Sequence, residues 1–284
     1  HDNFQTSWGD GNTPPLWDGT LCDAKIPMDL NGSFQLEVHG TSFGFLNDFI
    51  ETYTYDYDVD CDSDGVKDFI SQTGGTTCHY DENTTHLLSI QGTLPYFRAD
   101  EAFVEGIRNI ENWGNGTWRS MKSTFQGAHK LRGIAPDAGI PIFSDEGVDL
   151  ERVFSKTRIF NADLSEWNTS NVVSLYAAFS LAFGFDSDLS NWDTDSLDIL
   201  TYAFHGTSKF KGTGLSQWDV SKVTHFIGTF QYSKAFNADL TQWDVSSATH
   251  MGHMFHSAKA FVNNDLSCWD VENVTTSANF SKSW

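Results

Sequence analysis

Positive charge is scarce in this chain. Its 284 residues include 17 lysines and arginines against 38 aspartates and glutamates, which gives a net charge of −21. Such an excess of negative charge repels phosphate backbones and anionic lipids, so we expect no nucleic-acid partner. It suits divalent cations or cationic partners instead. No apolar run approaches the roughly 20 residues of a membrane helix, so we also expect no membrane span.

Enzyme motifs are missing as well. The sequence has no nucleophile motif and no phosphate-binding loop, and no spacing selects a carboxylate pair from its scattered acids. His250, His253 and His256, with His225 one repeat earlier, could bind a metal ion, but exposed surface histidines are the simpler interpretation. We therefore predict that the protein is not an enzyme and needs no cofactor, apart from the structural calcium ion considered below.

Cysteine is rare, at four residues. Cys61 and Cys78 flank a short, turn-rich segment and are the best candidates for a disulfide, with free buried thiols as the alternative. The pairing of Cys22 and Cys268 stays open, because these residues lie far apart in the sequence.

The chain does contain many N-glycosylation sequons. Six of them begin at Asn31, Asn83, Asn115, Asn168, Asn273 and Asn279. A sequon is used only on an exposed turn of a protein that passes through the secretory route. With the disulfide candidates, the sequons predict an extracellular protein, secreted or at the cell surface, with N-linked glycans. No signal peptide precedes His1, so we expect a processed or trimmed start.

A repeat organises residues 160–284. The motif Leu-Ser/Thr-x-Trp recurs there at intervals of 25 or 26 residues, and a phenylalanine ladder keeps the same period. Such periods indicate a solenoid, in which each unit buries its apolar face against its neighbours. Projected backward, the ladders begin at Trp113 and Phe125. The predicted repeat core is Trp113, Trp167, Trp192, Trp218, Trp243, Trp269, Phe125, Phe154, Phe179, Phe204, Phe230, Phe255 and Phe280.

Each unit divides into two segments. Val223, Phe226 and Phe230 are spaced by three or four residues, which predicts a short helix or 3₁₀ turn. The Asp-Leu-Ser-x-Trp piece is predicted to be a strand that stacks in parallel on its neighbours. Its aspartates would repel one another along a strand, so we expect turns in which they cap backbone N–H groups, rather than a cation-binding row. These aspartates are Asp163, Asp188, Asp239 and Asp265.

The residues before the repeat alternate between apolar and polar over 33–39, 53–59 and 86–92. Short strands separated by turns predict a small β-sandwich. The chain therefore divides into an N-terminal arm (1–30), a sandwich (31–100) and a solenoid of about seven units, the last incomplete (101–284). The predicted fold class is mainly β with short helices.

An aspartate-rich turn interrupts the predicted sandwich. Asp60, Asp62, Asp64 and Asp68 stand at the first, third, fifth and ninth positions of an EF-hand-type loop, with a glycine at the sixth. The twelfth position is Ser71 instead of a bidentate glutamate, and the flanks alternate like strands. A weak, extracellular type of calcium site is one interpretation, and a solvated hairpin turn is the other.

Two resemblances add to these patterns. Residues 55–92, with the Asp-x-Asp-x-Asp-Gly turn and Cys78-His79-Tyr80, resemble a PKD-type immunoglobulin-like domain, although cysteines replace some of its usual residues. Residues 236–246, followed by the Met-Gly-His-Met-Phe of residues 251–255, resemble the BspA-like surface-protein repeat, a leucine-rich-repeat relative. This second similarity covers residues 107–284. It implies an extracellular protein used for adhesion or protein contacts, and it implies no catalytic residues.

These patterns lead to a function. The last unit stops at Trp284 without a polar cap, and uncapped solenoid edges invite association. We therefore expect a structural or adhesive glycoprotein that self-associates head to tail into a filament or coat. The alternative is a solenoid binding module that recognises a protein or glycan at the cell surface. A remote alternative is a copper enzyme acting on polysaccharide, since His1 is similar to the terminal histidine of copper monooxygenases.

Overall fold

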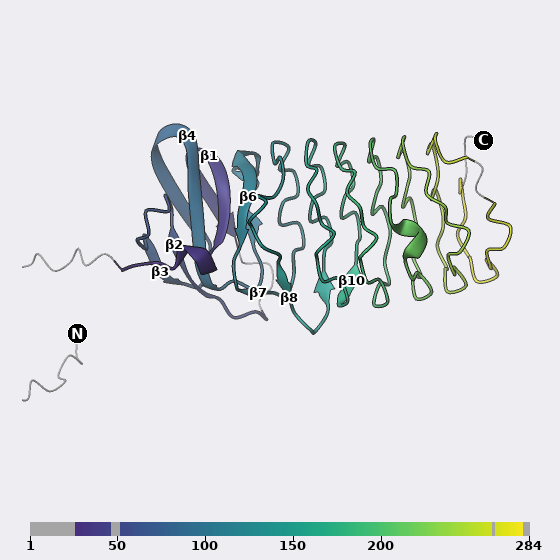
Figure 1. Ribbon diagram of the computed structural model, residues 1–284, viewed down its shortest axis with the longest axis horizontal. Helices are drawn as coiled ribbons and strands as arrows, with labels where there is room; N and C mark the ends of the chain where they lie inside the picture. Colours follow the sequence, from purple (N-terminus) through teal and green to yellow (C-terminus); the bar gives the residue numbers. More distant parts are fainter. Residues whose placement is uncertain (1–25, 47–51, 263–264, 281–284) are drawn as a thin grey trace, which may run out of the picture.

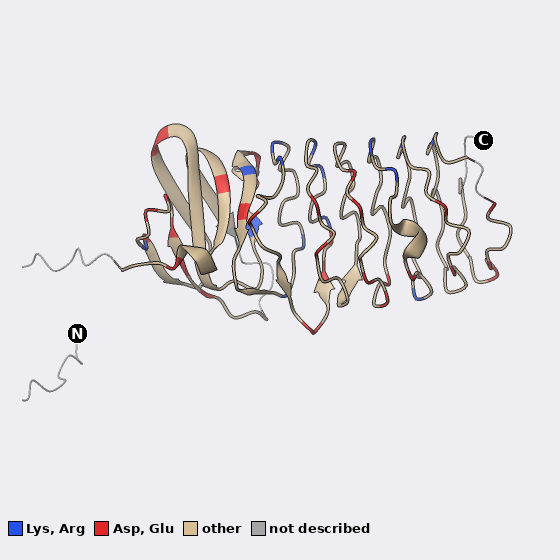
Figure 2. Ribbon diagram, viewed as in Figure 1, with Lys and Arg blue, Asp and Glu red and all other residues tan. Residues whose placement is uncertain are grey.

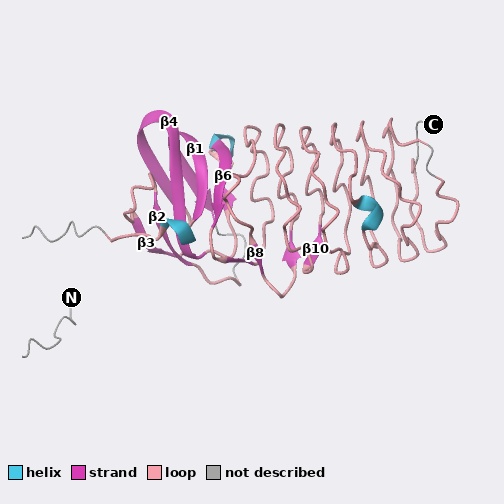
Figure 3. Cartoon of the chain, in the orientation of Figure 1, coloured by secondary structure: helices cyan, strands magenta, loops and turns pink. Residues whose placement is uncertain are grey.

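The computed structural model describes residues 26–46, 52–262 and 265–280. An antiparallel sheet forms the N-terminal end, and a long stack of coils extends from it (Figure 1). The regular elements are strands and short 3₁₀ turns (Figure 3), so the predicted mainly β class is confirmed. In the described ranges, no helix has the length and apolar character needed to cross a membrane.

The N-terminal sheet has six strands. They are β1 (Phe34–Leu46), β2 (Asp56–Asp60), β3 (Phe69–Gln72), β4 (Thr76–Thr93), β5 (Arg98–Ala99) and β6 (Ile107–Trp113). The order is β3-β2-β4-β1-β5, and β6 also pairs with β1. The alternating segments lie within or overlap β1, β2 and β4 as predicted. Because the strands form one sheet, the predicted two-sheet sandwich is wrong for the described residues.

The length of β4 explains the error. The sequence marks only residues 86–92 of this strand, because the exposed polar residues 81–85 interrupt the apolar alternation that marks a half-buried strand. In the structure β1 and β4 form one long antiparallel ladder, which pairs Phe34 with Ile90 at one end and Phe45 with Thr76 at the other. The separate short strands expected from the sequence are therefore parts of one long ladder between two strands that are not consecutive in the chain.

Strand β6 joins the sheet to the coils. One edge of β6 pairs with β1. From the other edge the Ile110 N–H donates to the Gly133 carbonyl at 3.1 Å. The Phe34 ring packs on Trp113 and Trp118, with ring centroids 6.1 and 5.0 Å apart. One hydrophobic core therefore runs without a break from the sheet into the coils.

The coils contain little regular secondary structure. Parallel pairs join β7 (Thr117–Trp118) to β8 (Ile142–Phe143) and β9 (Val148–Asp149) to β10 (Val172–Ser174). The 3₁₀ turns are η2 (Leu30–Gly32), η3 (Val104–Gly106) and η4 (Leu215–Gln217). Later coils are joined by single parallel bridges between equivalent residues. These bridges follow the column Ser174, Ile199, His225, His250 and Thr276.

Aromatic ladders fill the interior of the stack. Phe179 and Phe204 stack with centroids 5.6 Å apart and an interplanar angle of 3°. Trp192 and Trp218 stack at 6.0 Å and 4°. Four tryptophans, Trp192, Trp218, Trp243 and Trp269, also donate their indole N–H to the leucine carbonyl of the preceding coil, as Trp218 does to Leu189 at 3.1 Å. The repeat-core residues are all buried except Phe280, which is half-buried.

The two segments of each unit have the reverse of their predicted structures. The Leu-Ser-x-Trp piece forms a tight turn, closed by a backbone hydrogen bond from Trp192 to Leu189 at 3.2 Å. The segment before each phenylalanine makes the parallel contacts, and left-handed residues recur within it. Ala177 and Leu181 have φ of 51° and 60°, and their N–H groups donate across to the next coil. Alternate residues therefore point their N–H groups along the stack, and neither a helix nor an extended strand forms.

A matched pair of alanines tests the left-handed conformation of Ala177. Ala177 is left-handed and the adjacent Ala178, also buried, is not. Glycine relieves left-handed strain of about 1–2 kcal/mol but costs about 0.5–1 kcal/mol in chain entropy. We predict that Ala177→Gly leaves the free energy of unfolding unchanged or raises it by up to about 1 kcal/mol, whereas Ala178→Gly lowers it by about 1 kcal/mol. Equal losses in urea denaturation of both variants would contradict the assignment.

Candidate functional site

The aspartate loop connects β2 to β3. Asp60 is fully buried at the end of β2, and its two carboxylate oxygens accept N–H groups from Asp62 at 3.3 Å and from Gly65 at 2.9 Å. Asp68 accepts the Cys61 N–H at 2.8 Å. Gly65 has φ of 86°, a conformation that favours glycine. The carboxylates therefore hold the shape of the loop by binding its own backbone.

Three of the four predicted ligands converge. Oxygen atoms of Asp60, Asp62 and Asp68 all lie within 4.8 Å of one another, while Asp64 is not part of this group. Burial raises the pKa of Asp60, against the lowering effect of N–H donors from Gly65 and neighbouring residues. Grouped carboxylate oxygens are the donor set of a hard divalent cation, so these residues fit calcium. The loop hydrogen bonds fit an ordinary turn equally well.

A disulfide fixes this loop to β4. Cys61 and Cys78 are bonded, with Cα atoms 5.7 Å apart, as predicted. The Tyr80 hydroxyl donates to the Cys61 carbonyl at 3.0 Å. Burial, reinforced by the charges of Asp62, Asp68 and Asp60, raises the pKa of Tyr80. Cys268 is a free, exposed thiol, and Cys22 lies outside the described residues.

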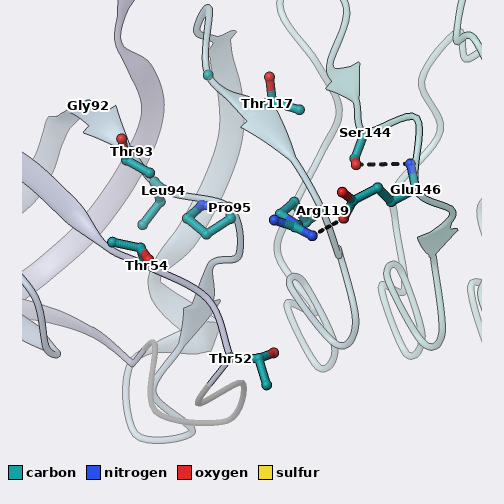
Figure 4. Close-up of a pocket in the computed structure, with 11 residues that line it drawn as sticks. Thr52, Thr54, Gly92, Thr93, Leu94, Pro95, Thr117, Arg119, Ser144 and Glu146 are labelled. Carbon is teal, nitrogen blue, oxygen red and sulfur yellow. Dashed lines mark hydrogen bonds and ion pairs between the residues drawn. The ribbon is translucent and has the colours of Figure 1, made fainter.

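A pocket lies where the sheet meets the coils (Figure 4). It has a volume of about 420 Å³. Threonines from the end of β4 and from β7 line it, and Arg119 forms an ion pair with Glu146 at its coil side. The Arg119 guanidinium also lies over the Tyr53 ring, 5.1 Å from its centroid. The described residues that line the pocket include no histidine or cysteine. Its acid and its base, Glu146 and Arg119, are paired with each other, so neither is free to act as a general acid or base.

The sequons are well placed for glycosylation. The asparagine side chains of five of them are exposed: Asn31, Asn83, Asn115, Asn168 and Asn273. Asn279 is half-buried, and the serine that completes its sequon lies outside the described residues.

The repeat aspartates form turns as expected. Asp163 and Asp188 accept the backbone N–H two residues ahead at 2.9 and 2.8 Å, and Asp239 and Asp265 do the same. Hydrogen bonds from these N–H groups and from the neighbouring hydroxyls lower the pKa of all four. The aspartates therefore act as turn caps.

The histidines do not converge on a point. His225 and His250 stack on adjacent coils, 4.6 Å apart, and each accepts or donates through Nδ1 to a neighbouring threonine hydroxyl. His253 packs edge-on against His256 at 5.7 Å. The second pair belongs to a larger feature, here called the ring stripe, in which rings from successive coils contact one another. Its members are Tyr176, Tyr202, His205, Tyr232, His256 and His253.

The repeats can be assigned to a family. Two overlapping segments, residues 144–213 and 190–283, match the family described as Mycoplasma protein of unknown function, DUF285. Residues 144–283 are DUF285 repeats. The BspA-like repeat region predicted over 107–284 is therefore confirmed over this part. The DUF285 match leaves out the N-terminal sheet, so the PKD-like resemblance gains no support from it. No curated protein and no solved structure matches the chain.

Calcium binding at the aspartate loop can be tested with a neighbouring aspartate as the control. A cation that binds only the folded state stabilises it by about 1.4 kcal/mol at tenfold its dissociation constant. We predict that millimolar calcium raises the unfolding temperature of the wild-type protein, and that Asp62→Asn abolishes this shift. Asp64→Asn, just outside the converging group, should retain the shift. Thermal unfolding that is indifferent to calcium up to about 10 mM would show a plain turn, because extracellular sites bind at about 0.1–1 mM.

Proposed function

We propose that the protein is an extracellular structural or adhesive glycoprotein of a cell surface, in which the coils form a leucine-rich-repeat-like solenoid that holds a partner. The continuous core from sheet to coils supports this proposal most directly. This core joins the sheet and the coils into one body. Equivalent surface positions on successive coils are then roughly 4.8 Å apart, which is the spacing of neighbouring strands. Regular, rigid ladders of side chains suit the recognition of an extended partner.

The extracellular location has two independent supports. The disulfide between Cys61 and Cys78 is of a kind that persists in oxidising compartments and is rare in the cytosol. Five sequon asparagines are exposed to modifying enzymes. N-linked glycans would cover the sheet and parts of the coils.

A specific feature favours the binding-module version of this function. The ring stripe places half-exposed tyrosines and histidines side by side over several coils, and the Tyr232 side chain is 46% exposed. Amphipathic rings in such positions are typical of recognition surfaces. Head-to-tail self-association stays a prediction, because residues 1–25 and 281–284 lie outside the described part. His1, on which the copper-enzyme alternative depends, also lies outside the described residues.

Surface labelling of cells that produce the protein tests the proposal. A membrane-impermeant biotin reagent should label it on intact cells, and peptide N-glycosidase should increase its electrophoretic mobility. Asn168→Gln should remove one step of that mobility change, whereas Asn161→Gln, which is outside any sequon, should not. Labelling only after lysis, with no effect of the glycosidase, would refute an extracellular glycoprotein.

A further inference from the structure

Charge on the stack is sorted to opposite edges, despite the acidity of the whole chain. One edge consists of the turns 126–132, 155–160, 180–185, 205–210, 231–236 and 256–261, here called the basic edge. These turns contain seven lysines and arginines and no aspartate or glutamate. Figure 2 shows blue at several of these coil tips and red mainly elsewhere. The net charge of −21 therefore conceals a strip of positive charge.

Backbone hydrogen bonds hold these turns in register. A residue of each turn donates its N–H to a carbonyl of the next turn, over 2.7–2.9 Å. The pairs are Gly127 to Ser155, Lys156 to Ser180, Leu181 to His205, Gly206 to Gln231 and Tyr232 to His256. The cations consequently lie in register on five of the six coils, with the turn 180–185 as a gap without lysine or arginine, and the six coils extend over roughly 24 Å.

With one exception, the cations of the basic edge form no ion pair with the described residues. Elsewhere in the stack, Lys122 pairs with Glu151 and Lys211 pairs with Asp186, and on the edge itself Arg132 pairs with Glu37. The remaining edge cations are exposed and form no ion pair with the described residues: Lys130, Lys156, Arg158, Lys209, Lys234 and Lys259. Like charges on adjacent strands repel one another. An anion that bridges neighbouring coils would remove this repulsion.

Apolar side chains stand among these cations. Phe183 is 40% exposed, and with Leu181 it lines a hollow of about 290 Å³ together with Lys156, Arg158 and His129. Tyr232, from the ring stripe, lies in the same set of turns. Rings and aliphatic surface offer stacking to a sugar ring, while the adjacent cations bind its acidic substituents. None of the six sequons falls in these turns.

We propose that the basic edge binds a linear anionic polysaccharide, whose carboxylates or sulfates lie along the cation ladder. A thin chain stays on the edge and away from the acidic turns on the opposite side, such as 193–196 and 270–273. A membrane or a nucleic-acid duplex is broader and would meet that repulsive charge. The choice of a polysaccharide rests on the proposed extracellular function, and it names the partner class of that function.

Binding of defined polymers to the full-length protein tests this proposal. The probes are dextran sulfate, polygalacturonate, uncharged dextran and a single-stranded oligonucleotide, each measured by biolayer interferometry at low and raised salt. We expect both anionic polysaccharides to bind, with affinity that falls as salt rises, and we expect dextran not to bind. The triple variant Lys209→Ala/Lys234→Ala/Lys259→Ala should lose about tenfold or more in affinity for them.

The control variant removes three positive charges from other parts of the protein. Lys67→Ala/Lys122→Ala/Lys222→Ala also makes the protein three charges more negative, and it should bind within about twofold of wild type. Both triples should keep the wild-type circular dichroism spectrum. The edge lysines form no ion pair with the described residues, and the only ion pairs among these residues that the control breaks are the half-buried pair of Lys67 with Asp58 and the more exposed pair of Lys122 with Glu151, which is too small a loss to unfold the chain.

Several outcomes would overturn the proposal. These are equal losses in the two triple variants, equal binding of dextran, tighter binding of the oligonucleotide than of polygalacturonate, or no binding at all. Self-association that is abolished by the edge variant, without polysaccharide binding, would assign the ladder to the acidic turns of a second copy. An intracellular location found by surface labelling would refute the proposed function and leave the measured polymer binding unchanged, so the two failures are distinguishable.

Discussion

The stack depends on one repeated contact, in which a buried tryptophan donates its indole N–H to the leucine carbonyl of the coil before it. The distances are 2.9, 3.1, 2.7 and 3.0 Å for Trp192, Trp218, Trp243 and Trp269. The same leucine carbonyl also accepts the backbone N–H of the tryptophan in its own turn, so the indole is its second donor. One such hydrogen bond contributes about 0.5–1.5 kcal/mol. Trp192 also stacks on Trp218, and Trp243 on Trp269, so these side chains both bond the backbone and set the coil spacing. Surface side chains at equivalent positions of successive coils therefore have the same spacing.

The contact also explains why the sheet is needed. Trp113 holds the first place in the tryptophan ladder, and its buried indole N–H has no hydrogen-bond partner in the described part of the chain. In place of a preceding coil, Trp113 has β1 beside it, with Phe34 packed on its ring. The sheet therefore supplies the apolar surface that a preceding coil would otherwise supply. The N-terminal sheet and the stack of coils therefore share one hydrophobic core, and the aromatic ladders of the coils begin at the sheet.

Sequence patterns predicted the parts of this structure that repeat or alternate. The aromatic ladders, the turn-capping aspartates and the Cys61–Cys78 disulfide all follow from spacing or from turn chemistry. The parallel contacts of residues such as Ala177 did not, because a left-handed alanine or tyrosine leaves no mark in hydrophobic periodicity. The sandwich was predicted wrongly, because the polar middle of β4 looks like a loop. The basic edge was missed because net charge averages over the chain. Sorting lysines by their position within the repeat would have revealed it.

The most direct test of the account compares a buried tryptophan whose indole N–H is hydrogen-bonded with one whose indole N–H is not. Trp218 and Trp113 are both buried, but only the Trp218 indole has a carbonyl partner. Trp218→Phe should lower the free energy of unfolding by about 0.5–1.5 kcal/mol more than Trp113→Phe, because it removes one of the two donors to the Leu189 carbonyl and leaves only the Trp192 N–H, whereas the Trp113 indole has no partner to lose. Equal losses for the two variants in urea denaturation would mean that ring packing alone holds the coils together, and would contradict the account.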